Sequence, residues 1–255
     1  MKSVITHWNP DGTRIGEVTC DEETPDGPEF LWHPNGQLHQ ETFFVAGQRQ
    51  GPGRMWYPNG QLQDESTFKD HQREGRCTCW YENGQLSRQM TYRAGQIHGP
   101  HTEWHENGQV MAQTLYVADK WEGLRTTWYA NGQQETEGAY LEDKPIGLHR
   151  VWHQNGRLKQ EARYQHGALE GLTTDWFENG QQQQEATWSD DKFDGPFKQW
   201  HENGQLVVET AYRAGKQEGP CSTWHPNGVK AWECRYRDDE PDGVILEWDE
   251  HGEPL

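Results

Sequence analysis

The sequence has few of the residues that usually build a core or a membrane span. Leu, Ile, Val and Phe make up only about 14% of the 255 residues, a fraction typical of disordered chains. No apolar run reaches the roughly 20 residues of a transmembrane helix, and the apolar core of a secretory leader is absent after Met1. The 12% of aromatic residues, however, is too high for a disordered polar chain. The order of the residues must therefore decide between disorder and a fold.

Basic residues and cysteine frameworks are also scarce. The chain has 23 Lys and Arg residues against 41 Asp and Glu residues, a formal net charge of −18. A charge of this sign disfavours binding to nucleic-acid phosphates or to anionic lipid. The five cysteines form an odd set without a familiar disulfide or zinc spacing, and reduced thiols are typical of the cytosol. We therefore expect a cytoplasmic protein with no nucleic-acid or membrane partner.

One 24-residue repeat runs through the chain. Asn-Gly recurs every 24 residues from Asn35 to Asn227, and the phase extends to Asp11-Gly12 and His251-Gly252. A Trp lies three residues before each position, and in most repeats an aromatic residue lies nine after it. This regularity excludes disorder and predicts a single repeat domain over 1–255, with a divergent start (1–26), nine full repeats (27–242) and a half repeat (243–255). The expected structural core is the Trp column: Trp32, Trp56, Trp80, Trp104, Trp128, Trp152, Trp176, Trp200, Trp224 and Trp248.

Each repeat is predicted to form one β-hairpin. Twenty-four residues are too few for two helices and their connection, and Gly and Pro recur too often for a long helix. The expected order is strand, tight turn, strand and a longer turn that contains the repeat's other Gly. The predicted fold is all-β: an elongated single-layer antiparallel β-meander of about ten hairpin repeats.

The Asn-Gly turn fixes the expected pairing of the two strands. Pro often precedes Asn, as in Pro34-Asn35-Gly36, which favours a type I turn with a G1 bulge. A two-residue type I′ turn is the alternative, but it would make Pro a ladder residue. The bulged turn places Trp32 opposite Leu38. Strict alternation then puts the tyrosine column, including Tyr92, on the Trp face and the Gln and Glu columns on an opposite polar face.

Metal and catalytic sites are not expected. Two residues four apart on a strand, such as His101 and His105, are about 13 Å apart, too far to share one ion. Cys77 and Cys79 share one face of a strand, but no matching pair lies one hairpin away, so they are interpreted as incidental. No P-loop, nucleophile elbow or dinucleotide fingerprint occurs. The sequence therefore predicts no metal, no cofactor and no enzymatic activity.

Acidic longer turns are the first candidate binding surface. An Asp or Glu immediately precedes the repeat's Gly in most repeats, and such a row of carboxylates would steer a basic protein. Trp121 is expected in one of these turns, either exposed as a binding anchor or packed onto a neighbouring turn. The candidate partner-binding residues here are Trp121, Glu122, Glu170, Asp194 and Glu218.

The C-terminal edge strand is the second candidate. Val244–Trp248 is the most apolar strand in the sequence, and Ile245 is expected on its polar face. An exposed apolar edge strand promotes aggregation unless it is protected. Either the neighbouring acidic residues guard it, or a partner strand or a second copy covers it. A homodimer through this edge is therefore one expectation.

The repeat unit itself resembles a known family. The pattern Gly-(x)4-Trp-x-x-Asn-Gly-Gln-Leu-x-x-Glu-x-x-Tyr is similar to the MORN-repeat variant of YwqK-type bacterial antitoxin-like proteins. Typical MORN repeats carry Tyr-x-Gly in the first strand, and this chain does not. The resemblance implies a β-hairpin array that neutralises a toxin by direct binding, as an antitoxin or immunity protein. A general protein-interaction scaffold is the alternative function.

Overall fold

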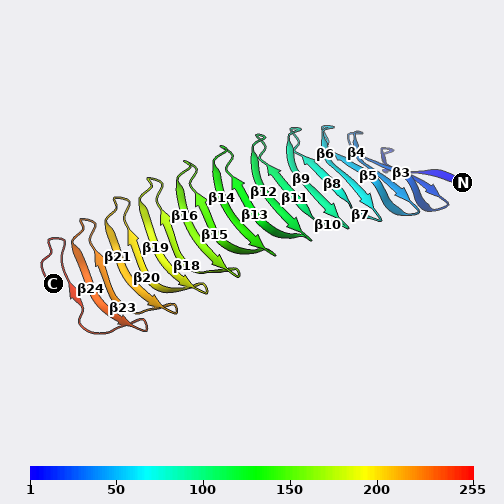
Figure 1. Ribbon diagram of the computed structural model, residues 1–255. Helices are drawn as coiled ribbons and strands as arrows, with labels where there is room; N and C mark the ends of the chain where they lie inside the picture. The colour runs from blue at the N-terminus through cyan, green and yellow to red at the C-terminus, as the bar shows by residue number, and fades with distance from the viewer. The chain divides into compact units, whose positions relative to one another are not determined.

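The computed structural model describes residues 1–255 and contains β-strands but no helix (Figure 1). Contacts between Cα atoms group the chain into two compact units, Met1–Gly123 with Ala130–Gly132 and Leu124–Tyr129 with Gln133–Leu255. Within each unit the strands are antiparallel and pair in chain order, so each unit is a single-layer β-meander. The predicted all-β hairpin fold is confirmed. The single domain over 1–255 stays a prediction.

The strands follow the 24-residue repeat. The first unit contains β1 (Lys2–Trp8), β2 (Arg14–Asp21), β3 (Thr24–Trp32), β4 (Leu38–Val45), β5 (Gln48–Trp56), β6 (Leu62–Lys69), β7 (Gln72–Arg73), β8 (Gly75–Trp80), β9 (Leu86–Arg93), β10 (Gln96–Ile97), β11 (Gly99–Trp104) and β12 (Val110–Val117). Residues of β13 (Lys120–Trp128) belong to both units. The second unit contains β14 (Gln134–Leu141), β15 (Lys144–Trp152), β16 (Leu158–Gln165), β17 (Ala168–Leu169), β18 (Gly171–Trp176), β19 (Gln182–Ser189), β20 (Lys192–Trp200), β21 (Leu206–Arg213), β22 (Lys216–Gln217), β23 (Gly219–Trp224), β24 (Lys230–Arg237), β25 (Glu240–Pro241) and β26 (Leu246–Glu247).

The Asn-Gly turns have the predicted geometry. The N–H of Gly36 donates to the carbonyl of His33 at 2.9 Å, and the N–H of His33 donates to the carbonyl of Gln37 at 2.8 Å. Gly36 has a φ of +83°, the left-handed conformation that a G1 bulge requires. Trp32 accordingly pairs with Leu38. Proline and glycine chemistry within the turn was sufficient to predict this pairing.

A second bulge follows each Asn-Gly turn and reverses the predicted faces. Trp32 pairs with Leu38 but Leu31 pairs with Gln40, so the strand β4 has one extra residue at His39. The same displacement recurs in the other hairpins. Because an extra residue shifts the alternation of all later side chains, the predicted position of the tyrosines on the Trp face is wrong. Tyr92 instead packs with residues of the opposite face.

The two faces therefore differ from the predicted apolar and polar faces. On the Trp face, Arg54 lies directly opposite Glu65, so the Glu column shares the face of the tryptophans. The other face, which we call the buried face, carries the most buried side chains, and these are small: Cys20, Ser66, Cys77, Ala162, Ala186, Thr210, Cys221 and Cys234 are examples. The Trp column is only half-buried, and Trp8 is 60% exposed. Small side chains thus form the core, which is why aliphatic residues are few.

The turns between repeats are shorter than predicted. Val45 pairs with Gln48 across two residues, Ala46 and Gly47, which both have positive φ angles of 47° and 81°. This is the backbone of a type I′ turn. The repeat's other Gly, here Gly51, lies within the following strand at an irregularity of the pairing. The predicted longer turn is therefore wrong: it is a two-residue turn followed by a bulged strand.

Side chains connect each repeat to the next. The amide nitrogen of Asn59 donates to the carbonyl of Glu82 at 2.9 Å, and the hydroxyl of Tyr57 donates to the carbonyl of Trp80 at 2.9 Å. Both partners lie 23 residues further along the chain. Equivalent bonds recur at most Asn and at many His or Tyr positions of the two units. They hold neighbouring hairpins in a fixed register.

Candidate functional site

The predicted acidic residues support the turns between repeats. The carboxylates of Glu170, Asp194 and Glu218 each accept a hydrogen bond from the backbone N–H that opens a two-residue turn, at 3.3, 3.3 and 3.2 Å. At the equivalent position of the first unit, hydrogen bonds from Lys2 and then from the Ala46 N–H lower the pKa of the Asp26 carboxyl. These carboxylates therefore have a structural role in addition to their charge.

More exposed carboxylates lie in the two-residue turns themselves, and the sequence analysis missed them. Asp190 and Asp191 form one such turn and Asp238 and Asp239 another, all exposed and all with positive φ angles between 47° and 70°. Their spacing of 48 residues, two repeats, is visible in the sequence. These four residues, called here the turn carboxylates, lie at the edge of the second unit opposite its Asn-Gly turns.

Trp121 does not lie in a turn. It belongs to β13, is half-buried, and donates from its indole nitrogen to the hydroxyl of Tyr116 at 2.7 Å. Glu122 follows it in the same strand and is also half-buried. The prediction of a turn residue was wrong because the turn consists of Ala118 and Asp119 only and ends before Trp121. Of the two alternatives left open, packing describes Trp121 better than an exposed anchor.

The C-terminal strand is shorter than predicted. β26 contains only Leu246–Glu247, whereas Ile245 lies outside it and is 47% exposed. Ile245 therefore has no position within a strand, and the predicted strand over 244–248 is wrong at its start. The N–H of Leu255 donates to the carbonyl of Glu247 at 3.0 Å, so the chain's own last residues lie along this edge. A homodimer through it stays a prediction.

The Trp face carries ion pairs across neighbouring strands and one broad cavity. Arg54 contacts Glu65 at 2.8 Å, and this hydrogen bond raises the pKa of the Arg54 guanidinium. Similar pairs join Arg150 to Glu161 and Lys198 to Glu209, each at 2.9 Å. A cavity of about 440 Å³ is lined by Trp80, Leu86, Glu65, Arg76 and Gln89, among others. Because these groups are solvent-exposed or paired with each other, they offer a mixed polar and apolar surface rather than a reactive centre.

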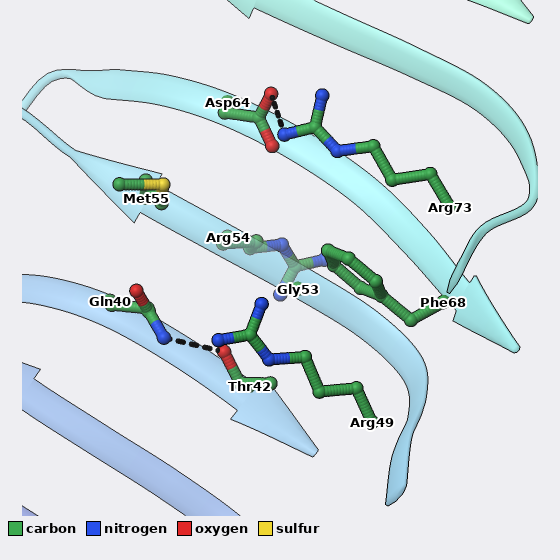
Figure 2. Close-up of a pocket in the computed structure, with 9 residues that line it drawn as sticks. All are labelled: Gln40, Thr42, Arg49, Gly53, Arg54, Met55, Asp64, Phe68 and Arg73. Atoms are coloured by element: carbon green, nitrogen blue, oxygen red, sulfur yellow. Dashed lines mark hydrogen bonds and ion pairs between the residues drawn. The ribbon is translucent and has the colours of Figure 1, made fainter. Parts of the chain in front are cut away.

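A smaller cavity of about 120 Å³ lies on the buried face (Figure 2). It forms where Gly53 takes the position that Cys77 and His101 occupy in the next repeats. The Phe68 ring covers the glycine, and an added Cβ would meet its Cε2 atom at 2.7 Å. Figure 2 shows the Arg73 side chain directed at Asp64, with a contact of 3.3 Å. The cavity is therefore bounded on one side by a charged pair.

Asp64 also contacts two buried thiols. Its Oδ2 atom lies 3.3 Å from the sulfur of Cys77 and 3.3 Å from that of Cys79, and the two sulfurs are 4.0 Å apart. The hydrogen bond between the thiols lowers the pKa of Cys77, and the same bond together with burial raises the pKa of Cys79. The cysteines expected on a polar face are instead 1% and 7% exposed. We call Asp64, Cys77 and Cys79 the thiol cluster.

The repeats match a family model. The model of the MORN repeat variant covers residues 25–46, 49–70, 73–94, 97–118, 145–166 and 193–214, which together are just over half of the chain. The chain belongs to the MORN repeat variant family. Each matched MORN repeat starts ten residues before its Asn-Gly position, at the strand that follows a two-residue turn.

Some solved structures are distantly similar to this MORN repeat protein. Three are the "Crystal Structure of TcdB2-TccC3-Cdc42", the "Crystal Structure of TcdB2-TccC3-TEV" and the "Structure of Photorhabdus luminescens Tc holotoxin pore, Mutation TccC3-D651A", each 12% identical, with TM-scores of 0.22, 0.20 and 0.23. The matches cover 96%, 98% and 96% of this chain. This chain corresponds to only 15% of the length of each of the three matched chains. No curated protein matches the chain. No helix in the structure is long and apolar enough to cross a membrane.

Proposed function

We propose that this MORN repeat protein works by binding another protein, without catalysis, and that its partner is a basic toxin neutralised by direct contact in the cytoplasm. A binding role is what MORN repeats suggest. The net charge of −18 supports a basic partner, because opposite charges speed diffusional encounter and suppress association with acidic proteins. The antitoxin role is the more specific part of this proposal.

The observation that carries the proposal is the exposed row of turn carboxylates. Asp190 with Asp191 and Asp238 with Asp239 extend from the same edge of the second unit, two repeats apart. Two repeats contain four strands, so the pairs are separated by about 19 Å at the usual strand spacing. That distance suits two contacts on one small protein domain. The carboxylates of Glu170 and Glu218 accept hydrogen bonds from the backbone of Asp190 and Asp238, and they add negative charge next to these turns.

Identification of the partner tests the proposal. The tagged chain is purified at low salt from its native host, and the co-purifying protein is then expressed alone and together with the chain in a bacterial host. We expect a basic protein that arrests growth alone and is tolerated in co-expression. An acidic partner contradicts the role assigned to the net charge, and a partner without toxicity contradicts the antitoxin role. Several non-toxic partners support the general scaffold instead.

Association kinetics test the turn carboxylates directly. Replacing Asp190, Asp191 and Asp239 by Asn removes three charges, and Asn tolerates positive φ and keeps an oxygen for the N–H of Leu169 and Gln217. We expect the association rate with the identified partner, measured at low salt by surface plasmon resonance, to fall about fivefold or more.

The control removes three charges from the opposite edge of the same unit. Glu178 and Glu202 are exposed residues of Asn-Gly turns, and Glu250 is exposed in the equivalent turn at His251-Gly252. Their replacement by Gln leaves the net charge equal to that of the first variant. We expect a clearly smaller reduction of the association rate. Equal reductions in both variants show that net charge alone steers the partner. An unchanged rate in both excludes electrostatic steering.

A further inference from the structure

We propose that the thiol cluster Asp64, Cys77 and Cys79 is a binding site for a thiophilic divalent metal ion, with Zn²⁺ as the best match. Cys77 and Cys79 alternate with Thr78 along β8 and therefore point to the same face. Asp64 is the register partner of Cys79 on the neighbouring strand β6. Two thiols and a carboxylate thus converge from adjacent strands, and this convergence follows from the backbone pairing.

The distances within the thiol cluster match a tetrahedral centre. Zn–S bonds of about 2.3 Å and a Zn–O bond of about 2.0 Å separate two sulfurs by about 3.8 Å and a sulfur from an oxygen by about 3.5 Å. The observed separations are 4.0 Å between the sulfurs and 3.3 Å from each sulfur to Asp64 Oδ2. Each differs from the tetrahedral value by about 0.2 Å. An ion can therefore be held with small side-chain adjustments.

Neighbouring groups orient the ligands and balance their charge. The hydroxyl of Ser66 donates to Asp64 Oδ1 at 2.6 Å, which leaves Oδ2 directed at the sulfurs. The Arg73 guanidinium lies 3.3 Å from Asp64 Oδ2 and 3.7 Å from the sulfur of Cys77. The net charge of the occupied site is zero, because the divalent cation and this guanidinium balance two thiolates and one carboxylate. Such outer groups fix ligand geometry at protein metal sites.

The packing around the thiol cluster distinguishes it from two cysteines that lie close together by chance. Met90, Tyr92 and Ile97 pack against the two cysteines and exclude water from one side. Next to Asp64, the 120 Å³ cavity is bounded by Asp64 and Arg73 and lined by neither cysteine, and it is large enough for a water molecule on the carboxylate side of the cluster (Figure 2). Thiolates select Zn²⁺ over Mg²⁺ and Ca²⁺, which prefer oxygen ligands. The arrangement is that of a site with three protein ligands and one exchangeable position.

Metal titration of the whole chain tests the proposal. The protein is reduced, freed of metal with a chelator, and titrated with Zn²⁺ in competition with a chromophoric chelator, and with Co²⁺ in the absorption spectrometer. We expect one ion per chain and a thiolate-to-cobalt charge-transfer band. Cys77→Ser with Cys79→Ser should weaken zinc binding at least about 100-fold and abolish the band, and Asp64→Asn should weaken binding about tenfold.

Two buried cysteines of the second unit provide the matched control. Cys221 and Cys234 are both 4% exposed and pair across one hairpin, and Cys221 lies near the amide of Gln217 rather than a carboxylate. Cys221→Ser with Cys234→Ser should leave zinc binding unchanged. A stoichiometry of zero, or loss of binding only in this control variant, overturns the proposal.

Thiol alkylation tests the unsubstituted protein, so the result does not depend on the folding of a variant. Zn²⁺ should slow the reaction of Cys77 and Cys79 with a maleimide, measured on proteolytic peptides by mass spectrometry, and leave the rates of Cys221 and Cys234 unchanged. Equal protection of all four, or none, contradicts a site at the thiol cluster. A disulfide between Cys77 and Cys79 whose reduced form takes up no metal also overturns it.

Discussion

The same positions of the buried face hold different chemistry in the two units. The thiol cluster and its neighbours have counterparts 96 residues later, four repeats along the chain. Asp64, Ser66, Arg73, Cys77 and Cys79 correspond to Gln160, Ala162, Leu169, Thr173 and Asp175. Asp64 is the register partner of Cys79, and Gln160 likewise pairs with Asp175, so the backbone arrangement is the same. The repeat therefore provides a geometry, and single residues decide what it can bind.

The second-unit counterpart is a hydrogen-bonded group without soft ligands. The amide of Gln160 donates to Asp175 at 2.8 Å, and the indole of Trp188 donates to the hydroxyl of Thr173 at 2.8 Å. Burial raises the pKa of the Asp175 carboxyl, because no cation comparable to Arg73 lies in contact with it. The Asp64 carboxylate is thus stabilised by an ion pair, whereas the Asp175 carboxylate is stabilised mainly by the amide of Gln160, with a smaller contribution from the charge of Lys159.

Transfer of the thiol cluster to the second unit should have the largest effect. The substitutions Gln160→Asp, Ala162→Ser, Leu169→Arg, Thr173→Cys and Asp175→Cys reproduce the first-unit residues on matching strands. We expect zinc stoichiometry, measured by competition titration, to rise from one to two ions per chain. The variant without the two cysteine substitutions serves as control and should keep one. If both variants fold and both bind one ion, backbone register is not sufficient to create the site.

Removal of the two carboxylate charges should change stability in opposite directions. In metal-free protein, Asp64→Asn leaves the partly exposed Arg73 without its ion pair and should lower the free energy of unfolding by about 1–2 kcal/mol. Asp175→Asn keeps the bond to Gln160 and should raise it at pH 7 by less than about 1 kcal/mol. Urea unfolding with a chelator present, combined with hydrogen exchange to locate the change, measures both.

The gain from Asp175→Asn should depend on pH. The folded-state pKa of Asp175 is raised, so the protonated carboxyl favours the folded state. This contribution to the free energy of unfolding is complete below the unfolded-state pKa near 3.8 and is lost as the pH rises through the folded-state pKa. The difference between variant and parent should therefore increase from about pH 4 to pH 7. A constant difference over this range contradicts the assigned cause.

Loss of the Ser66 hydroxyl should lower stability less than loss of the Asp64 charge. Ser66→Ala removes the bonds to Asp64 and to the Cys77 sulfur, and should weaken zinc binding about tenfold and cost about 1 kcal/mol of unfolding free energy. The matched change in the second unit, Ala162→Ser, places a hydroxyl near that of Thr173 and should alter stability by less than about 0.5 kcal/mol. Calorimetric melting and zinc competition measure the two effects. If both changes lower the free energy of unfolding equally, the loss at Ser66 comes from local packing, and the role assigned to its hydrogen bonds is wrong.

The repeat and its turns could be predicted from the sequence because both depend on local chemistry. Pro34, Asn35 and Gly36 restrict their own backbone angles, and the resulting turn sets the pairing of Trp32 with Leu38. The faces could not be predicted, since the second bulge has no marker residue. Its extra position is occupied by His39, Gln63, Ser87, Met111, Lys159 and Val207 in successive examples. Side chains beyond this bulge therefore lie on the face opposite to the one that strict alternation from the turn predicts.

The candidate sites were harder to predict for a related reason. Cys77 and Cys79 are visible in the sequence as a pair without a second cysteine pair nearby, whereas the group that approaches them is the carboxylate of Asp64 on the previous hairpin. Its approach depends on the register between β6 and β8, which includes the bulges. Trp121 and Ile245 were misplaced because the turns and the last strand are shorter than the repeat pattern suggests. The acidic character of the turn edge, by contrast, follows directly from composition.

The bonds between Asn side chains and the next repeat also constrain how the gene can change. Each of these amides reaches a carbonyl 23 residues later, so an insertion of one residue between them removes the acceptor. Duplication or deletion of a complete 24-residue segment restores every bond, because the new neighbour presents the same carbonyl. Stability in such arrays depends on neighbouring repeats only. The number of hairpins can therefore change by whole-repeat recombination, and the length of the sheet changes by one complete repeat at a time.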